Sequence, residues 1–356
     1  RGGQVEFNKG RLILLDTKFG CLPTIIGSMP QTDPLAACSQ ITHYLKDIPA
    51  WPQLPKRSFL ENMYVQYSEG FPGVVIEMEG ERIYVDRSQD VSALLERLYT
   101  AYLENNADEY PISEEYAAGL EAFLGLDDIS PRAMKGQVTG PVSWGLTVTD
   151  KDKRSIIYDD VLGDAAAKLL RLKASWQEKK LSKISSNTII FVDEPYMTSF
   201  GSAFVSISRE KVISLLNEVF GGISGLKGVH CCGNTDWSVL LDTNADILNF
   251  DTYNFAESLT LFPAEMKKFL ERGGAVAWGI VPNEAEVLAG ETVASLKERL
   301  EEAIAPFTRN GIPFSQLIEQ GLLTPSCSLT TLSEEASARA LELLTDLSAA
   351  IRKRYL

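Results

Sequence analysis

The stretch GVHCCGNTDW (228–237) holds one of the chain's two histidines and two of its five cysteines. It closes a predicted strand over 225–232. Residues i and i+2 of a strand point to the same face, so His230 and Cys232 share a face and Cys231 points away. An imidazole and a thiolate at one strand end supply half of a tetrahedral zinc site.

The other half of such a site must come from neighbouring strands. Asp251 ends the next predicted strand and Cys327 ends the last one. The predicted metal ligands are therefore His230, Cys232, Asp251 and Cys327. An isolated H-x-C pair is also compatible with a buried core histidine that packs beside small buried cysteines. The metal site is favoured here because Cys232 and Cys327 both lie at the ends of predicted strands. Residues without such a context are interpreted as structural: His43, Cys21 and Cys38.

Zinc bound by cysteine and histidine favours chemistry at sulfur. It accepts an incoming thiol and lowers the thiol pKa from about 8.5, which yields a nucleophilic thiolate at neutral pH. Two thiolate ligands make the metal a poor Lewis acid toward water, which disfavours hydrolysis. A structural zinc usually takes ligands from local C-x-x-C knuckles, and the sequence has none. Alkyl transfer to a thiol is the predicted reaction.

Short apolar runs alternate with helical patterns along the chain. Helices are predicted from Asp90, Asp159, Ser208 and Thr292. Eight strand–helix units in 356 residues predict a single (β/α)8 barrel, with a doubly wound open sheet as the alternative. In a barrel, catalytic groups lie at the C-terminal strand ends. The predicted strands are 23–28, 63–68, 136–144, 188–195, 225–232, 246–253, 274–281 and 321–327.

Two segments fall outside this repeat. Residues 73–86 (GVVIEMEGERIYVD) predict a β-hairpin with its turn at 79–81, inserted after the second strand. Residues 1–20 are assigned to an N-terminal extension, in which 9–20 form an appended strand or a cap. The whole chain, 1–356, is otherwise predicted to be one catalytic domain.

Composition limits the classes of partner. The net charge of −14 is spread along the chain without a Lys/Arg cluster, which argues against nucleic acid or an anionic membrane as a partner. The sequence has no apolar run long enough to span a bilayer. The few cysteines, two of them adjacent, favour a reducing compartment. We therefore expect a soluble, cytoplasmic protein whose partners are small molecules or other proteins.

Six ordered segments resemble the catalytic domain of cobalamin-independent methionine synthase. They also resemble its relatives, the corrinoid-dependent thiol methyltransferases of the uroporphyrinogen decarboxylase-like superfamily, and VHCCGNT (229–235) is closer to this corrinoid-using branch. The resemblance implies a (β/α)8 barrel, a zinc ion and methyl transfer to a thiol. The matching segments are TIIGSMPQT (24–32), TGPVSW (139–144), FVDEP (191–195), VHCCGNTD (229–236), ADILNFD (245–251) and TPSCSL (324–329).

The resemblance also assigns roles to individual residues. The zinc ligands of the family fall on His230, Cys232 and Cys327, and a glutamate ligand falls on Asp251. Aspartate is one methylene shorter, so Glu257 or an open position are the alternatives for the fourth ligand. The resemblance further implies a substrate site for the amino-acid part of homocysteine. Its backbone cradle is Ile26, Gly27 and Ser28, its ammonium partner is Asp193, and its second acidic partner is Glu61. The implied catalytic residues are His230, Cys232, Cys327 and Asp193.

Two departures bear on the methyl donor. Methionine synthases of this family carry a second, N-terminal barrel, for which 356 residues leave no room. After TGPV they continue with a tryptophan-containing segment that holds folate, whereas this chain reads SWGLTVTD (143–150). We therefore expect methylcobalamin or another methylated corrinoid as donor, supplied by a corrinoid protein, with homocysteine as acceptor. The alternatives are a coenzyme M-type methyltransferase, a porphyrinogen decarboxylase-like lyase and a non-catalytic barrel that binds a corrinoid or thiol.

Overall fold

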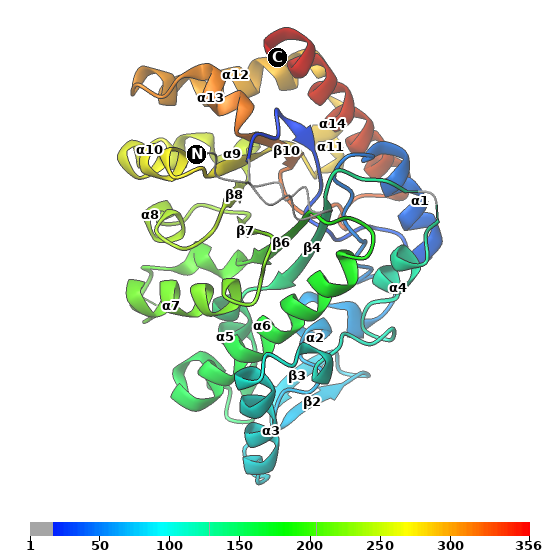
Figure 1. Ribbon diagram of the computed structural model, residues 1–356, viewed down its shortest axis with the longest axis vertical. Helices are drawn as coiled ribbons and strands as arrows, with labels where there is room; N and C mark the ends of the chain where they lie inside the picture. The colour runs from blue at the N-terminus through cyan, green and yellow to red at the C-terminus, as the bar shows by residue number, and fades with distance from the viewer. Residues whose placement is uncertain (1–16, 128, 204) are drawn as a thin grey trace, which may run out of the picture.

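The computed structural model describes residues 17–127, 129–203 and 205–356. A parallel sheet of seven strands forms its centre, in the order β1-β10-β9-β8-β7-β6-β4 (Figure 1). The sheet curls, and helices cover its outer face, as expected of a TIM-like fold. The strands of this sheet are β1 (Leu22–Pro23), β4 (Met134–Thr139), β6 (Thr188–Asp193), β7 (Leu226–Cys231), β8 (Ile247–Phe250), β9 (Ala275–Val281) and β10 (Gly321–Pro325).

Most helices connect successive strands. The four helices predicted from the sequence are confirmed as α3, α6, α7 and α12. Capping explains three of their starts, because Asp159, Ser208 and Thr292 each accept a hydrogen bond from a backbone N–H of the first turn. The helices are α1 (Pro34–Tyr44), α2 (Met63–Gln66), α3 (Ser92–Leu103), α4 (Ala118–Leu124), α5 (Pro141–Thr147), α6 (Asp160–Leu181), α7 (Arg209–Phe220), α8 (Trp237–Leu241), α9 (Thr252–Leu259), α10 (Pro263–Glu271), α11 (Ala285–Ala289), α12 (Val293–Arg309), α13 (Phe314–Glu319) and α14 (Glu334–Tyr355), with 3-10 turns η1 (Phe59–Glu61), η2 (Ala107–Glu109), η3 (Ile156–Tyr158) and η4 (Pro195–Ser199).

The segment 47–53 joins the two edges of the sheet. Lys135 N, in β4, donates to Pro49 O at 3.0 Å, and Gln53 N donates to Gly27 O, beyond β1, at 3.0 Å. Isolated parallel bridges accompany these bonds on both sides of the segment. Pro49 and Pro52 have no N–H to donate, so no continuous ladder forms. The prediction of a second strand over 63–68 is wrong, because α2 occupies the first four of these residues. The side chain of Asn62 caps the first turn of this helix.

The predicted hairpin residues pair outside the main sheet. β2 (Val74–Glu77) and β3 (Arg82–Val85) are antiparallel, and β5 (Thr149–Asp150) extends them to a three-stranded sheet. The hairpin follows a helical segment, so an insertion after a second barrel strand is not confirmed. Of the predicted N-terminal extension, residues 1–16 lie outside the described residues, and 17–20 lead directly into β1.

The interior of the curled sheet is layered. Its N-terminal half is filled by apolar side chains, which form a floor: Phe19, Leu22, Ile48, Ala133, Ile189, Phe191, Ile247, Ala275, Ala277 and Leu322. Buried polar side chains follow toward the C-terminal ends of the strands: Lys135, Gln137, Asp193, His230, Asn249 and Thr324. A buried polar layer is costly unless its groups are paired or used, which directs attention to this end of the sheet.

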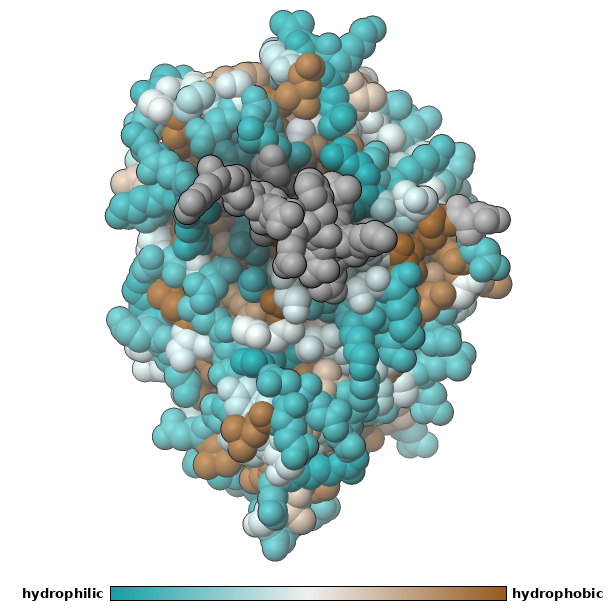
Figure 2. Space-filling view, in the orientation of Figure 1, coloured by the Kyte–Doolittle hydropathy of each residue, from teal (hydrophilic) through white to brown (hydrophobic). Residues whose placement is uncertain are grey.

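The outer surface matches the acidic composition. On the face that Figure 2 shows, apolar residues of the described chain gather in small groups between hydrophilic ones. Such scattered groups are ordinary for a protein surface. No helix in the described part of the chain is both long enough and apolar enough to cross a membrane.

Candidate metal centre

Three side chains predicted to bind zinc converge at the C-terminal end of the sheet. The ligand atoms of His230, Cys232 and Cys327 all lie within 4.8 Å of one another. Cys327 Sγ is 3.7 Å from His230 Nε2. A tetrahedral ion with bonds of about 2.3 Å to sulfur and about 2.0 Å to nitrogen separates its ligand atoms by about 3.5 to 3.8 Å. The donor set and its spacing therefore fit a zinc ion.

The curl of the sheet explains why residues 97 positions apart meet. β7, which carries His230, and β10, which precedes Cys327, are separated by β8 and β9 in the sheet. Their side chains nevertheless face the same interior because the sheet bends around it. Cys231 packs in the apolar core and is not part of the group of possible ligands, and burial raises its thiol pKa to about 12. The alternation that the sequence predicts along this strand is thus confirmed.

The two cysteines of the cluster interact with each other. A hydrogen bond from the Cys327 thiol lowers the pKa of Cys232, and the ring of His230 lowers it further, while burial opposes both. The same contact raises the pKa of Cys327. One thiolate and one thiol are therefore favoured in the absence of a metal. A divalent cation would favour the second deprotonation, because thiolates are the form that binds metals.

Asp251, the predicted fourth ligand, lies outside this group of three. It follows β8 and caps α9, where its carboxylate accepts from Asn254 N at 2.9 Å and from Asn254 Nδ2 at 2.7 Å. Burial raises its pKa, and Cys232 adds to the rise, so the carboxylate is near the cluster. Glu257, the alternative, lies on α9 and is exposed. Each oxygen of Asp251 already accepts one hydrogen bond from Asn254, so a metal ion would share the carboxylate with these bonds.

Asp193 ends β6 and pairs in register with His230 of β7. Its side chain is buried, and Oδ1 has no hydrogen-bond partner among the described residues. Burial raises its pKa, whereas His230 and Lys135 act in the opposite direction. A buried carboxylate oxygen without a partner is unfavourable. This oxygen is available to a cationic group of a ligand.

The predicted substrate cradle, residues 26–28, lies beside the segment that carries Cys327. Ser28 O accepts from Leu329 N at 3.1 Å, which ties 26–28 to the segment that carries Cys327. Gly27 has φ +150°, and a Cβ there would be 2.6 Å from the Gln137 side chain, so only glycine fits. Ile26 completes the predicted cradle, and its carbonyl oxygen accepts a hydrogen bond of 2.7 Å from Lys135 Nζ.

Glu61, the second predicted acidic partner, has a local role. Its buried carboxylate accepts from Arg57 Nη1 at 2.8 Å and from Leu54 N at 3.1 Å. These contacts hold η1 against the segment that joins the sheet edges. They do not connect Glu61 with the metal-binding group.

Two polar residues of the interior are not among those predicted from the sequence. Asn249, on β8, accepts from the His230 ring, and Lys135, on β4, holds the substrate cradle. Asn249 lies two positions before Asp251, and Lys135 lies four positions before Thr139. Because side chains alternate along a strand, these spacings place both residues on the inward face. Applying the same i, i+2 rule to Asp251 would have identified Asn249.

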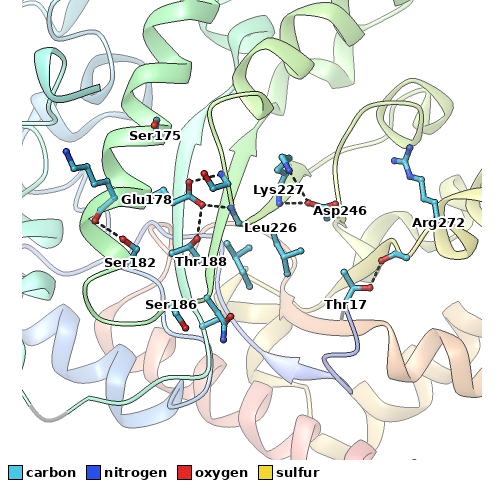
Figure 3. Close-up of a pocket in the computed structure, with 17 residues that line it drawn as sticks. Thr17, Ser175, Glu178, Ser182, Ser186, Thr188, Leu226, Lys227, Asp246 and Arg272 are labelled. Carbon is cyan, nitrogen blue, oxygen red and sulfur yellow. Dashed lines mark hydrogen bonds and ion pairs between the residues drawn. The ribbon is translucent and has the colours of Figure 1, made fainter. Parts of the chain in front are cut away.

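A separate cavity lies at the N-terminal ends of the strands. It has a volume of about 500 Å³ and is lined by residues at the N-terminal ends of the strands, including Thr188, Leu226 and Asp246 (Figure 3). Its buried acid, Glu178, is occupied by hydrogen bonds from Thr188 Oγ1, Ser224 N and Gly225 N. In barrels of this kind that end contributes to stability rather than to catalysis. The metal-binding group at the opposite end is therefore the candidate site.

Comparison with known proteins finds similar solved structures. No family model and no curated protein matches the sequence. A B12-independent methionine synthase from Shewanella sp. W3-18-1, solved with selenomethionine, matches with a TM-score of 0.59 and 16% identity over 94% of this chain and 98% of that chain. A methyltransferase from Methanosarcina mazei matches with a TM-score of 0.52 and 15% identity over 88% of this chain and 86% of that chain. At these identities the similarity establishes a shared fold.

Proposed function

We propose that the protein is a zinc-dependent methyltransferase that transfers a methyl group from a methylated corrinoid, carried by a separate protein, to the thiol of homocysteine. The convergence of His230, Cys232 and Cys327 is the observation that carries the proposal. The proposal is supported by the fold that the chain shares with a protein named as a methionine synthase and one named as a methyltransferase.

The residues of the site divide into two groups with separate tasks. His230, Cys232 and Cys327 would hold the zinc ion, with Asp251 as the proposed fourth ligand. The ion would supply positive charge that lowers the pKa of an acceptor thiol. No general base is then required of the protein. The remaining task is to hold sulfur and methyl carbon in line, which accounts for much of the rate in reactions of this type.

The second group would bind the amino-acid end of the acceptor. Asp193 Oδ1, buried and without a partner among the described residues, would accept a hydrogen bond from the ammonium of homocysteine. The backbone around Gly27 and Ser28 would receive its carboxylate. The sulfur of the bound acceptor would form the new bond to the methyl carbon, and the donor corrinoid would leave with the electron pair of its cobalt–carbon bond. The thiol proton leaves when the acceptor ionises.

Asp193 also discriminates between the acceptors considered. Coenzyme M carries a sulfonate and no ammonium, so it would leave the buried carboxylate without a partner. A porphyrinogen lyase would leave the three metal-binding side chains without a task. An amino-acid thiol would use both, because its ammonium would pair with Asp193 and its sulfur would bind at the proposed zinc ion. Homocysteine is therefore the acceptor that the site supports best.

A matched pair of cysteine variants tests the proposal. Cys232→Ala removes a ligand, whereas Cys231→Ala removes a buried thiol one residue away that points out of the site. We expect parent protein and Cys231→Ala to bind about one zinc per chain and to consume methylcobalamin when homocysteine is added. Cys232→Ala should lose both properties. Turnover at the parent rate by Cys232→Ala would refute the metal assignment, and turnover with coenzyme M alone would refute the acceptor.

A further inference from the structure

Asn249 makes contacts in the barrel interior that bear on the proposed zinc centre. Its side chain is fully buried on β8, directly beside His230 of β7. Asn249 Oδ1 is 2.5 Å from His230 Nδ1. On its other side, Asn249 Nδ2 is 2.7 Å from Ala277 O and 2.8 Å from Thr324 Oγ1.

These contacts fix the direction of the amide. A backbone carbonyl can only accept a hydrogen bond, so the group facing Ala277 O must be the donating NH₂ of Asn249. The opposite orientation would place two acceptor oxygens 2.7 Å apart in a dry interior. Oδ1 of Asn249 is therefore the atom that faces the imidazole, and it can only accept.

The direction of the amide in turn fixes the imidazole. Because Asn249 Oδ1 accepts, His230 Nδ1 must carry a hydrogen, and in the neutral ring Nε2 then holds the free electron pair. Nε2 is the atom that lies 3.7 Å from Cys327 Sγ. The electron pair is thus directed into the group of possible metal ligands.

We propose that Asn249, oriented by Ala277 and Thr324, is a positioning residue that holds His230 as the Nδ1-protonated tautomer with Nε2 ready to bind metal. The inference rests on the proposed zinc centre for its purpose. Outer partners of this kind typically contribute 10- to 100-fold to metal affinity.

The metal-free parent protein gives the first test. Nitrogen NMR of protein labelled in histidine contains signals from only two rings, and exposed His43 serves as the internal reference. Spectra are recorded at alkaline pH, where the ring is neutral, and there we expect His230 to show a protonated Nδ1 and an unprotonated Nε2. A protonated Nε2 in the neutral ring would overturn the proposal. Since no metal is needed, this result is independent of whether the parent protein binds zinc, which tests the proposed function.

Variants supply the second test, with zinc affinity measured against a competing chelator. Asn249→Leu keeps the approximate shape and removes the acceptor, so we expect about 10- to 100-fold weaker binding and loss of the fixed tautomer. Thr324→Val removes one of the two contacts that orient the amide, so we expect a smaller loss and an unchanged tautomer. The matched control is Thr243→Val, which removes an equally buried hydroxyl outside this network.

The outcomes separate positioning from general stability. If Asn249→Leu binds zinc as tightly as Thr243→Val, the proposal is wrong. If Asn249→Leu does not fold, Asn249→Asp decides, because it keeps an acceptor toward His230 Nδ1. Asn249→Asp should retain the Nδ1-protonated ring, and a ring protonated on Nε2 in that variant would also contradict the inference.

Discussion

The buried oxygen of Asp193 leads to a prediction about substrate choice. Asp193→Asn keeps the size of the side chain but removes the charge that would pair with the ammonium of homocysteine. A hydrogen bond to a charged group is worth about 1.5 to 3 kcal/mol, which corresponds to about 10- to 150-fold in affinity. We expect the KM or dissociation constant for homocysteine to rise by a factor in this range.

A second thiol isolates this contact from other effects of the substitution. In 4-mercaptobutyrate the ammonium of homocysteine is replaced by hydrogen, so its binding should be nearly equal in the parent and in Asp193→Asn. The assay is thiol-dependent loss of methylcobalamin absorbance with each thiol and each protein. Equal losses for both thiols would refute the ammonium contact, since a general defect of the site would affect the two alike.

Stability provides the control for folding. Burial raises the pKa of Asp193 above its unfolded value, so this carboxyl favours folding when protonated, and that contribution is lost as pH rises through the folded pKa. At neutral pH, Asp193→Asn no longer carries this cost. We therefore expect its free energy of unfolding at neutral pH to equal or exceed that of the parent, with the difference shrinking in acid. A loss of homocysteine binding would then not reflect unfolding.

Three further predictions follow from individual contacts. Gly27→Ala should destabilise the fold by about 1 to 3 kcal/mol in denaturant titrations, because its φ of +150° and the Gln137 side chain leave no room for a methyl group. Asn254→Ala should strengthen zinc binding about 2- to 10-fold in chelator competition if Asp251 is a ligand, since it frees one carboxylate oxygen; an unchanged affinity would argue against Asp251. Burial raises the pKa of Glu194 to about 7, so the parent should lose stability, on the order of 3 kcal/mol, as pH rises from about 4.5 to 7, and unfolding of Glu194→Gln should lack this loss.

The group of possible metal ligands could be predicted from local patterns in the sequence. Strand alternation placed His230 and Cys232 on one face, and the shared C-terminal edge of parallel strands brought Cys327 to them. The contact of Asp251 with Asn254 follows the pattern of a helix N-cap, which competes with metal binding for the same carboxylate. Whether Asp251 acts as the N-cap of α9 or as a metal ligand depends on whether a metal ion is bound. The alternation of residues along a strand cannot predict this.

The second strand shows the opposite case. Residues 63–68 (MYVQYS) are rich in the residue types that favour strands, yet they begin with a helix, because tertiary packing overrides weak local preferences. Residues 47–53 contain prolines at 49 and 52, which are typical of turns and sheet edges, so no strand was predicted there. Their place between β4 and Gly27 depends on contacts with distant segments that no local pattern encodes.

The interrupted join at 47–53 has a mechanical consequence for the substrate end of the site. Gln53 N donates to Gly27 O, and Gln53 O accepts from Met29 N, so the proposed cradle is attached to a segment in which no continuous ladder forms. Local opening is easiest where few backbone bonds must break at once. Opening at this segment would leave the continuous pairing of strands β6 to β10 intact.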